Sequence, residues 1–303
     1  MTKTLISICG PTAVGKTAMA IEVAQWLQTE IISNDSRQFY TELKIGTAPP
    51  SETELQQVKH HFIHNRSLFE DYSVGDFERE ALQKLSSLFQ THDAVVMVGG
   101  SGLYERAVTE GLDEFPEVSP EIRENLNQDF AEKGIEYLQN TLQQLDPEYF
   151  QQVDIHNYKR IIRALEICIG TGKPYSSFRK NNVEKRPFEV LKIGLEMDRA
   201  MLYDRINHRV DLMMEAGLLE EAQKWHPHKE LNALQTVGYR EFFDYFEGKI
   251  SLDFAIEEVK KNSRRFAKRQ MTWFRKDATI QWFSYNDLTG IQKYIKENTL
   301  IFK

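Results

Sequence analysis

A glycine-bounded loop near the start of the sequence has the residue types that hold phosphate. Residues 10–17 read GPTAVGKT, which matches GxxxxGK followed by serine or threonine and lies between an apolar run and a stretch of helical periodicity. In such a loop the glycines turn backbone N–H groups toward phosphate oxygens, the lysine supplies a positive charge, and the threonine hydroxyl can hold Mg²⁺. The pattern predicts that a polyphosphate binds here, but it does not say which one.

A nucleotide hydrolase or kinase also needs a carboxylate where a buried strand ends. The best candidate strand, 95–98, ends in two glycines and carries no acid there, which weakens that interpretation. The other candidate carboxylate is Asp35, in the polar stretch 34–38 that follows the apolar pair 31–32. A lone loop aspartate more often closes an Asx-turn. For Asp35, however, the expected position opposite a phosphate loop favours a chemical role. Its neighbours in the stretch 34–38 are suited to hydrogen-bond a heterocycle.

Two further patterns are weaker. Ser101 lies in GGSGLY, which lacks the full nucleophile-elbow pattern, so we interpret it as a hydroxyl at a strand end and not as a serine-hydrolase nucleophile. His60, His61 and His64 have no carboxylate or cysteine nearby at ligand spacing, so we expect structural roles for them.

The elements that must position these residues alternate between strand and helix. Residues 4–9 and 94–98 are continuous apolar runs, the pair 31–32 is a shorter one, and 17–27 has helical periodicity. Continuous buried strands alternating with helices indicate a parallel sheet, and its ligands lie beyond the carboxyl ends of the strands. We therefore expect the three polar segments that follow these strands to line one crevice.

From about Phe115 the pattern is helical, beginning at Ser119-Pro120. A strand pattern returns at 189–197, after which we expect helices to the end of the chain. The predicted fold class is α/β, a P-loop-containing parallel sheet core flanked by helices. We assign residues 1–114 and 187–303 to this core and 115–186 to an inserted all-helical unit.

Composition fits an enzyme that is not embedded in a membrane. The 303 residues carry a formal net charge of -7, and no apolar run approaches the roughly 20 residues that span a bilayer. Two distant cysteines suggest neither a metal site nor a disulfide framework, so we expect a cytoplasmic protein without a targeting segment or membrane partner.

Positive charge is concentrated in two segments of this acidic protein. Residues 156–186 are basic, and 259–276 contain no acid at all. In the second segment the basic residues recur along one helix face, with Phe266, Ala267 and Phe274 expected mostly elsewhere: Lys260, Lys261, Arg264, Arg265, Lys268 and Arg269. One such ridge is as often a solvated helix face, but two favour a phosphate-rich polymer as partner.

Taken together, these motifs resemble the tRNA dimethylallyltransferase (tRNA isopentenyltransferase) family, in its bacterial form without a zinc-finger extension. So many ordered segments are far more specific than a P-loop alone. In chain order they are GPTAVGKT, DSRQFY, IGTAPP, HHFIH, YSVGDF, GGSGLY, RIIRALEI, TGKP, INHRVDLMMEAGLLEEA, TVGYREF and AKRQMTWFRK.

The resemblance implies transfer of the dimethylallyl group from dimethylallyl diphosphate to N6 of adenosine 37, beside the anticodon of tRNAs that read codons beginning with U. It also implies a Mg²⁺-dependent enzyme whose helical insertion grips the anticodon stem-loop, and we expect a monomer. The implied catalytic residues are Asp35 as general base, Ser101 and Lys16. The implied diphosphate ligands are Gly10, Pro11, Thr12, Ala13, Val14, Gly15, Lys16, Thr17 and Arg209, with Thr17 also the metal ligand. The implied tRNA contacts are Asp35, Ser36, Arg37, Gln38, Ser101, Arg123, Lys159, Arg160, Ile161, Ile162 and Arg163.

Four positions depart from the commoner family pattern: Arg37, Phe39, Ser101 and Lys159. Serine keeps the hydroxyl at position 101, whereas Arg37 adds a charge that could change RNA affinity. Two other functions remain open. A P-loop small-molecule kinase or NTPase would turn over ATP without RNA, and an RNA-binding module with a vestigial loop would bind tRNA without turnover.

Overall fold

The computed structural model describes residues 2–179 and 184–301 and divides the chain into two compact units. The first extends to Thr109 and resumes at Lys185, and the second is Glu110–Glu184. The boundaries expected from the sequence, 114/115 and 186/187, lie a few residues further along the chain.

The first unit is built on a six-stranded sheet in the order β3-β2-β4-β1-β5-β6, with every strand pair parallel. Every residue of the central strands β1 and β4 is buried, as their continuous apolar sequences predict. The strands are β1 (Thr4–Cys9), β2 (Ile31–Ser33), β3 (His60–His61), β4 (Ala94–Val98), β5 (Glu189–Glu196) and β6 (Gln281–Ser284).

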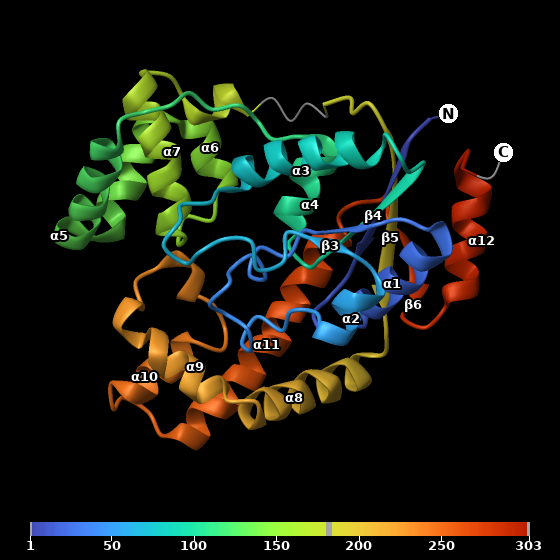
Figure 1. The fold of residues 1–303 in the computed structure, drawn as a ribbon. Helices are drawn as coiled ribbons and strands as arrows, with labels where there is room; N and C mark the ends of the chain where they lie inside the picture. Colours follow the sequence, from blue (N-terminus) through green and yellow to red (C-terminus); the bar gives the residue numbers. More distant parts are fainter. Residues whose placement is uncertain (1, 180–183, 302–303) are drawn as a thin grey trace. The chain divides into compact units, whose positions relative to one another are not determined.

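Helices cover both faces of this sheet (Figure 1). Side chains of β1 such as Ile6 and Ile8 pack with residues of α1, α8 and α12, whereas Leu5 packs with residues of α3 and α4. The helices are α1 (Lys16–Leu27), α2 (Glu52–Gln57), α3 (Val74–Leu88), α4 (Gly102–Glu110), α8 (Arg199–Glu215), α9 (Leu218–Trp225), α10 (Arg240–Phe246), α11 (Leu252–Phe274) and α12 (Leu288–Asn298). A separate apolar cluster joins α8, α9, α10 and α11, which run from yellow-gold to red-orange in Figure 1.

The expectation of helices alone after residue 197 is wrong, because β6 pairs with β5 at the edge of the sheet. Its sequence, QWFS, is short and only partly buried, so it lacks the apolar run that marks a central strand. The two-residue β3 at the opposite edge gives no strand signal for the same reason.

The described residues of the second unit form helices joined by irregular segments and contain no strand. It contains α5 (Pro120–Leu145), which begins at a proline, α6 (Pro147–Gln152), α7 (Tyr158–Thr171) and a 3₁₀ segment, Tyr175–Phe178. Leu138 and Leu142 of α5 pack against Ile161 and Leu165 of α7, which gives this unit its own apolar core.

No helix within residues 2–179 and 184–301 combines the length and the apolar character that crossing a membrane requires.

A buried polar cluster crosses the sheet of the first unit. Lys192 of β5 donates to Asp277 at 2.7 Å and lies 3.8 Å from Glu105 of α4, which accepts from Ser7 at 3.2 Å. Lys192 and Glu105 are only 6% and 4% exposed. The cluster thus ties α4 and the segment after α11 to the central strands.

Replacing Lys192 by methionine is expected to lower the free energy of unfolding by about 3 kcal/mol, because it removes the charge of Lys192 from the buried carboxylate of Glu105 and the half-buried carboxylate of Asp277. Lys293→Met is the matched control, since that lysine is 75% exposed and 3.9 Å from Glu297. Denaturant titration measures both variants. Equal losses would contradict the stabilising role of the buried cluster.

Candidate active site

The phosphate loop lies between β1 and α1, and its glycines are required by its geometry. Gly10 has φ +147°, and a Cβ there would lie 2.7 Å from the carbonyl oxygen of Leu195. Gly15 has φ +105° and caps the N-terminus of α1. Lys16 Nζ curls back to donate to Pro11 O at 2.8 Å. The loop therefore presents the helix N-terminus and one ammonium group to the same space.

Two cavities adjoin at this loop. One, of about 410 Å³, has many apolar side chains, and we call it the apolar cavity; the other, of about 380 Å³, is lined mainly by polar and charged groups, and we call it the polar cavity. Residues common to both are Thr12, Ala13, Asp35, Thr47, Ala48 and Arg209. Lys16 and Thr17 line the polar cavity, and Ser101 lines the apolar one. The structure thus brings the three segments that follow β1, β2 and β4 together at one edge of the sheet.

Asp35 is held by its own loop and by the loop after β4. Its Oδ1 accepts the Arg37 N–H at 3.1 Å, which is the Asx-turn considered from the sequence. Ser101 Oγ accepts the Ser36 N–H at 3.1 Å and lies 3.1 Å from Ser36 Oγ. Among the described residues, no hydrogen-bond donor contacts Asp35 Oδ2. The turn therefore orients the carboxylate and leaves one oxygen for another partner.

Two cations face Asp35 from the other side. Burial lowers the pKa of Lys16 to about 8, with Asp35 opposing the shift and Arg209 adding to it. Burial also lowers the pKa of Arg209, whose guanidinium donates to Thr12 Oγ1 at 3.4 Å and to Ala48 O at 3.1 Å. Both groups are half-buried and close together, and such an arrangement of cations favours binding of an anion.

Gln38 is oriented by the loop that follows Leu43. Its Nε2 donates to Ala48 O at 2.9 Å and to Thr47 O at 3.4 Å. The beginning of that loop is held by Glu221 of α9, whose carboxylate accepts N–H groups of residues 44–46 and the Tyr239 hydroxyl. The amide of Gln38 is thus fixed beside the shared part of the cavities.

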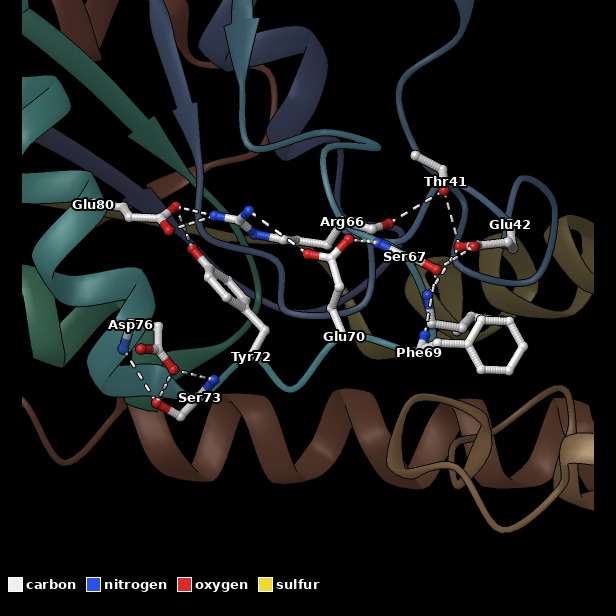
Figure 2. A network of polar contacts seen from close by, with 11 residues as sticks. Thr41, Glu42, Arg66, Ser67, Phe69, Glu70, Tyr72, Ser73, Asp76 and Glu80 are labelled. Carbon is white, nitrogen blue, oxygen red and sulfur yellow. Dashed lines mark hydrogen bonds and ion pairs between the residues drawn. The ribbon is translucent and has the colours of Figure 1, made fainter. Parts of the chain in front are cut away.

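A polar network anchors the chain just after Gln38 (Figure 2). Glu42 accepts from Ser67 Oγ at 2.7 Å, and Thr41 Oγ1 donates to Arg66 O at 3.2 Å. Arg66 in turn pairs with Glu80 of α3, which also accepts the Tyr72 hydroxyl at 3.1 Å. The segment that carries Asp35 is therefore tied to a helix at its far end.

Arg37 lines the apolar cavity and is tethered by backbone carbonyl groups. Its Nη1 donates to Asn232 O at 3.0 Å and to Ala233 O at 3.3 Å. This charge, which the sequence marks as a departure from the family pattern, is held in place at the cavity.

The basic face of α11 is partly neutralised. Lys260 pairs with Asp211 at 2.8 Å and Lys261 pairs with Glu258, whereas the last three basic residues of the ridge are exposed: Arg265, Lys268 and Arg269. Phe266 is 40% exposed and Trp273 is 41% exposed, and both line the apolar cavity. The expectation that Phe266 lies away from the basic face is therefore wrong, because its ring stacks with Arg269.

The second unit carries the other expected RNA contacts. Lys159 and Arg160 are exposed in the first turn of α7, and Arg123 and Arg163 both pair with Glu166.

The structure shows that the side chains of Ile161 and Ile162, two of the expected RNA contacts, are not on the surface. Their side chains are 0% and 2% exposed and form part of the core of the second unit. Helical periodicity turns these two positions inward while their basic neighbours face outward.

Gln270 of α11 is a site residue that sequence reasoning missed. It lines the apolar cavity, its Oε1 accepts the Thr12 N–H at 2.8 Å, and its Nε2 donates to Gly100 O at 2.9 Å. The signal was its spacing from Ala267 and Phe274, which puts an uncharged amide on the buried face of a basic helix.

The described residues contain no cluster of three or more histidine, cysteine, aspartate or glutamate side chains that could hold a metal ion. His61 contacts Glu30 at 2.6 Å, and His60 Nδ1 lies 2.8 Å from Val58 O. Residues with oxygen donors that line the polar cavity include Thr17, Asp35 and Glu54.

Comparison with known proteins places this geometry in context. Residues 38–277 match the model of a family described as IPP transferase. The chain is 58% identical over 287 residues to a tRNA dimethylallyltransferase of Christiangramia forsetii, covering 95% of each chain. It is 53% identical over 303 residues to a tRNA dimethylallyltransferase of Flavobacterium johnsoniae, covering 98% of each chain.

Solved structures that resemble this chain are also transferases that act on tRNA. A tRNA isopentenylpyrophosphate transferase of Bacillus halodurans superposes with a TM-score of 0.73 at 36% identity, covering 97% of this chain and 96% of that one. A eukaryotic dimethylallyltransferase acting on tRNA superposes with a TM-score of 0.79 at 25% identity, covering 97% of this chain and 78% of that one.

Proposed function

The chain belongs to the IPP transferase family, and we propose that it transfers the dimethylallyl group of dimethylallyl diphosphate to N6 of adenosine 37 in tRNAs that read codons beginning with U. The products are N6-(dimethylallyl)adenosine in tRNA and diphosphate. One observation carries the proposal: Asp35 lines both adjoining cavities, the polar one with the Lys16 ammonium of the phosphate loop and the other with apolar walls.

At the polar end, the loop residues bind the diphosphate. As the allylic C1–O bond breaks, negative charge accumulates on the leaving diphosphate, so cations and N–H dipoles placed there stabilise the transition state. Lys16, Arg209 and the N-terminus of α1 meet this requirement. The apolar walls of the other cavity suit a hydrocarbon chain.

Mg²⁺ fits the donor set at this end. It prefers oxygen ligands and is usually held by one or two protein groups together with substrate phosphates. Thr17 Oγ1 is the protein ligand that we propose. When bound, the ion neutralises charge on the diphosphate, while Lys16 and Arg209 hold the same group from the protein side.

Asp35 is the base in this mechanism. The lone pair of the adenine N6 is delocalised into the ring, so the amine needs a base to remove its proton as the new C–N bond forms. The Asx-turn to Arg37 and the contact between Ser36 and Ser101 hold the carboxylate in position, and Oδ2 remains available to take the proton. Gln38 lies where its side chain can hydrogen-bond the adenine ring.

Stacked adenine cannot reach Asp35, so adenosine 37 must be flipped out of the anticodon loop. The exposed basic residues of α11 and of α7 then bind the phosphate backbone of the anticodon stem-loop. Both reacting sites are lined by one chain, which supports a monomeric enzyme. Because tRNA is the acceptor, we place the reaction in the cytoplasm.

Incubation with labelled dimethylallyl diphosphate, Mg²⁺ and unmodified tRNA tests the proposal. We expect the label in tRNA, at adenosine 37 after nuclease digestion and mass spectrometry. RNA-independent ATP turnover without label in the RNA would support the kinase or NTPase alternative. Tight tRNA binding without any turnover would support a binding module.

Arg37→Met tests the tethered charge at the apolar cavity. If the guanidinium contacts a phosphate, the variant lowers the salt dependence of tRNA affinity by about one unit of slope. Filter binding across a range of salt concentrations measures this slope. Arg79→Met is the control, because that arginine is 75% exposed on α3. An unchanged salt dependence would contradict a phosphate contact and would limit Arg37 to its hydrogen bonds with the carbonyl groups of residues 232 and 233.

A further inference from the structure

Gln270 joins two loops that come from distant parts of the sequence. Its carboxamide bonds Thr12 in the phosphate loop at 2.8 Å and Gly100 in the loop after β4 at 2.9 Å. An amide has one acceptor end and one donor end, so a single side chain satisfies an N–H on one loop and a carbonyl on the other. Gln270 is 6% exposed, which makes both hydrogen bonds costly to lose.

On the Gly100 side, the contact continues to the proposed base. Ser101 follows Gly100 directly, and its hydroxyl contacts both the N–H and the hydroxyl of Ser36. Ser36 is the neighbour of Asp35, so the hydrogen bond from Gln270 fixes the loop against which the Asp35 segment rests. A shift of Gly100 would therefore move the carboxylate.

On the Thr12 side, the contact continues to the proposed diphosphate site. Because the Thr12 N–H is committed to Gln270, this residue faces the polar cavity with its hydroxyl instead, and that hydroxyl accepts from Arg209 at 3.4 Å. The bridge thus fixes one end of the phosphate loop and one contact of an anion-binding cation.

We propose that Gln270 is a positioning residue that sets the separation between the diphosphate and the base. It acts through Thr12 and Gly100, while its helix presents the basic residues Lys268 and Arg269 to solvent. The inference rests on the proposed prenyl transfer. It gives α11 a second role besides its basic surface, because the same helix fixes the position of the phosphate loop relative to Asp35.

Gln270→Met keeps the side-chain length and removes both hydrogen bonds. We expect kcat for prenyl transfer to fall by about 10- to 100-fold, since small misplacements of reacting groups have effects of this size. The KM values for dimethylallyl diphosphate and for tRNA should change by less than about threefold, because the groups that contact the substrates remain. Gln223→Met, at an exposed position of α9, is the matched control.

Gln270→Glu separates the two ends of the bridge. It retains an acceptor for the Thr12 N–H but places a carboxylate oxygen against Gly100 O, so we expect kcat to be no higher than in Gln270→Met. Combining Gln270→Met with Ser101→Ala should reduce kcat by less than the product of the two single effects, because both changes act on the same loop.

The outcomes are distinguishable. Thermal unfolding and inhibition by inorganic diphosphate show whether a variant is folded with an intact phosphate loop. A kcat for Gln270→Met equal to that of Gln223→Met would overturn the positioning role. A loss confined to the two KM values, or effects that multiply fully with Ser101→Ala, would overturn it as well. Absence of transfer by the unmodified enzyme would overturn the proposed function and, with it, this inference.

Discussion

Replacing Asp35 by asparagine is expected to lower kcat for prenyl transfer by about 10²- to 10⁴-fold, the usual contribution of a positioned general base. Asparagine keeps the side-chain oxygen that accepts the Arg37 N–H, so the Asx-turn survives. It lacks a basic oxygen that can take the proton from N6. The substitution therefore removes the proposed chemistry while retaining the local structure.

Single-turnover transfer of labelled dimethylallyl to tRNA measures this effect apart from product release. Filter binding should give a tRNA affinity within about threefold of the original protein, since asparagine keeps the shape of the side chain and the hydrogen bond from the Arg37 N–H. Asp71→Asn, at an exposed position before α3, is the control. Undiminished transfer by Asp35→Asn would remove this carboxylate from the mechanism, and an equal loss of tRNA binding would make it a binding residue.

The central part of the fold could be predicted because burial on both faces leaves a clear signal. The runs 4–9 and 94–98 are continuous and apolar, and they form the fully buried strands β1 and β4. Parallel strands end at one edge of the sheet, so the segments after them must meet there. The proximity of Asp35 to Thr12 and Ser101 follows from this geometry.

The edges of the sheet could not be predicted in this way. β3 and β6 are short and only partly buried, so their pairing depends on backbone hydrogen bonds with a neighbour that the local sequence does not reveal. The contacts of Gln270 could not be predicted from the local sequence either. A buried amide at one helix position signals a partner, but only the fold shows that the partners lie on two separate loops.

Sequence motifs also mark segments more reliably than they mark side chains. The stretch from Lys159 to Arg163 reads as one basic segment, yet a helix turns successive side chains by about 100°. Ile161 and Ile162 consequently face the core of the second unit, whereas Lys159 and Arg160 face solvent. Helical periodicity, applied within the motif, separates the two groups.

Replacing Lys16 by methionine is expected to reduce kcat/KM for dimethylallyl diphosphate by about 10²- to 10³-fold, the range found when one preorganised group that stabilises developing charge is removed. The ammonium lies beside the N-terminus of α1 and faces the polar cavity. Methionine fills similar volume without the charge. Steady-state kinetics with saturating tRNA measure the loss, and Lys44→Met, outside both cavities, is the control.

The same lysine makes diphosphate binding depend on pH. Burial places the pKa of Lys16 near 8, so the group is a cation below that pH and loses its proton as the pH rises through it. Inhibition by inorganic diphosphate should therefore weaken above pH 8 in the unmodified enzyme. Lys16→Arg keeps its charge throughout this range. The diphosphate titrates in the same way with both proteins, so any difference between the two pH profiles comes from the titration of Lys16. Parallel profiles would show that the ammonium stays charged in the free enzyme and would contradict this pH dependence.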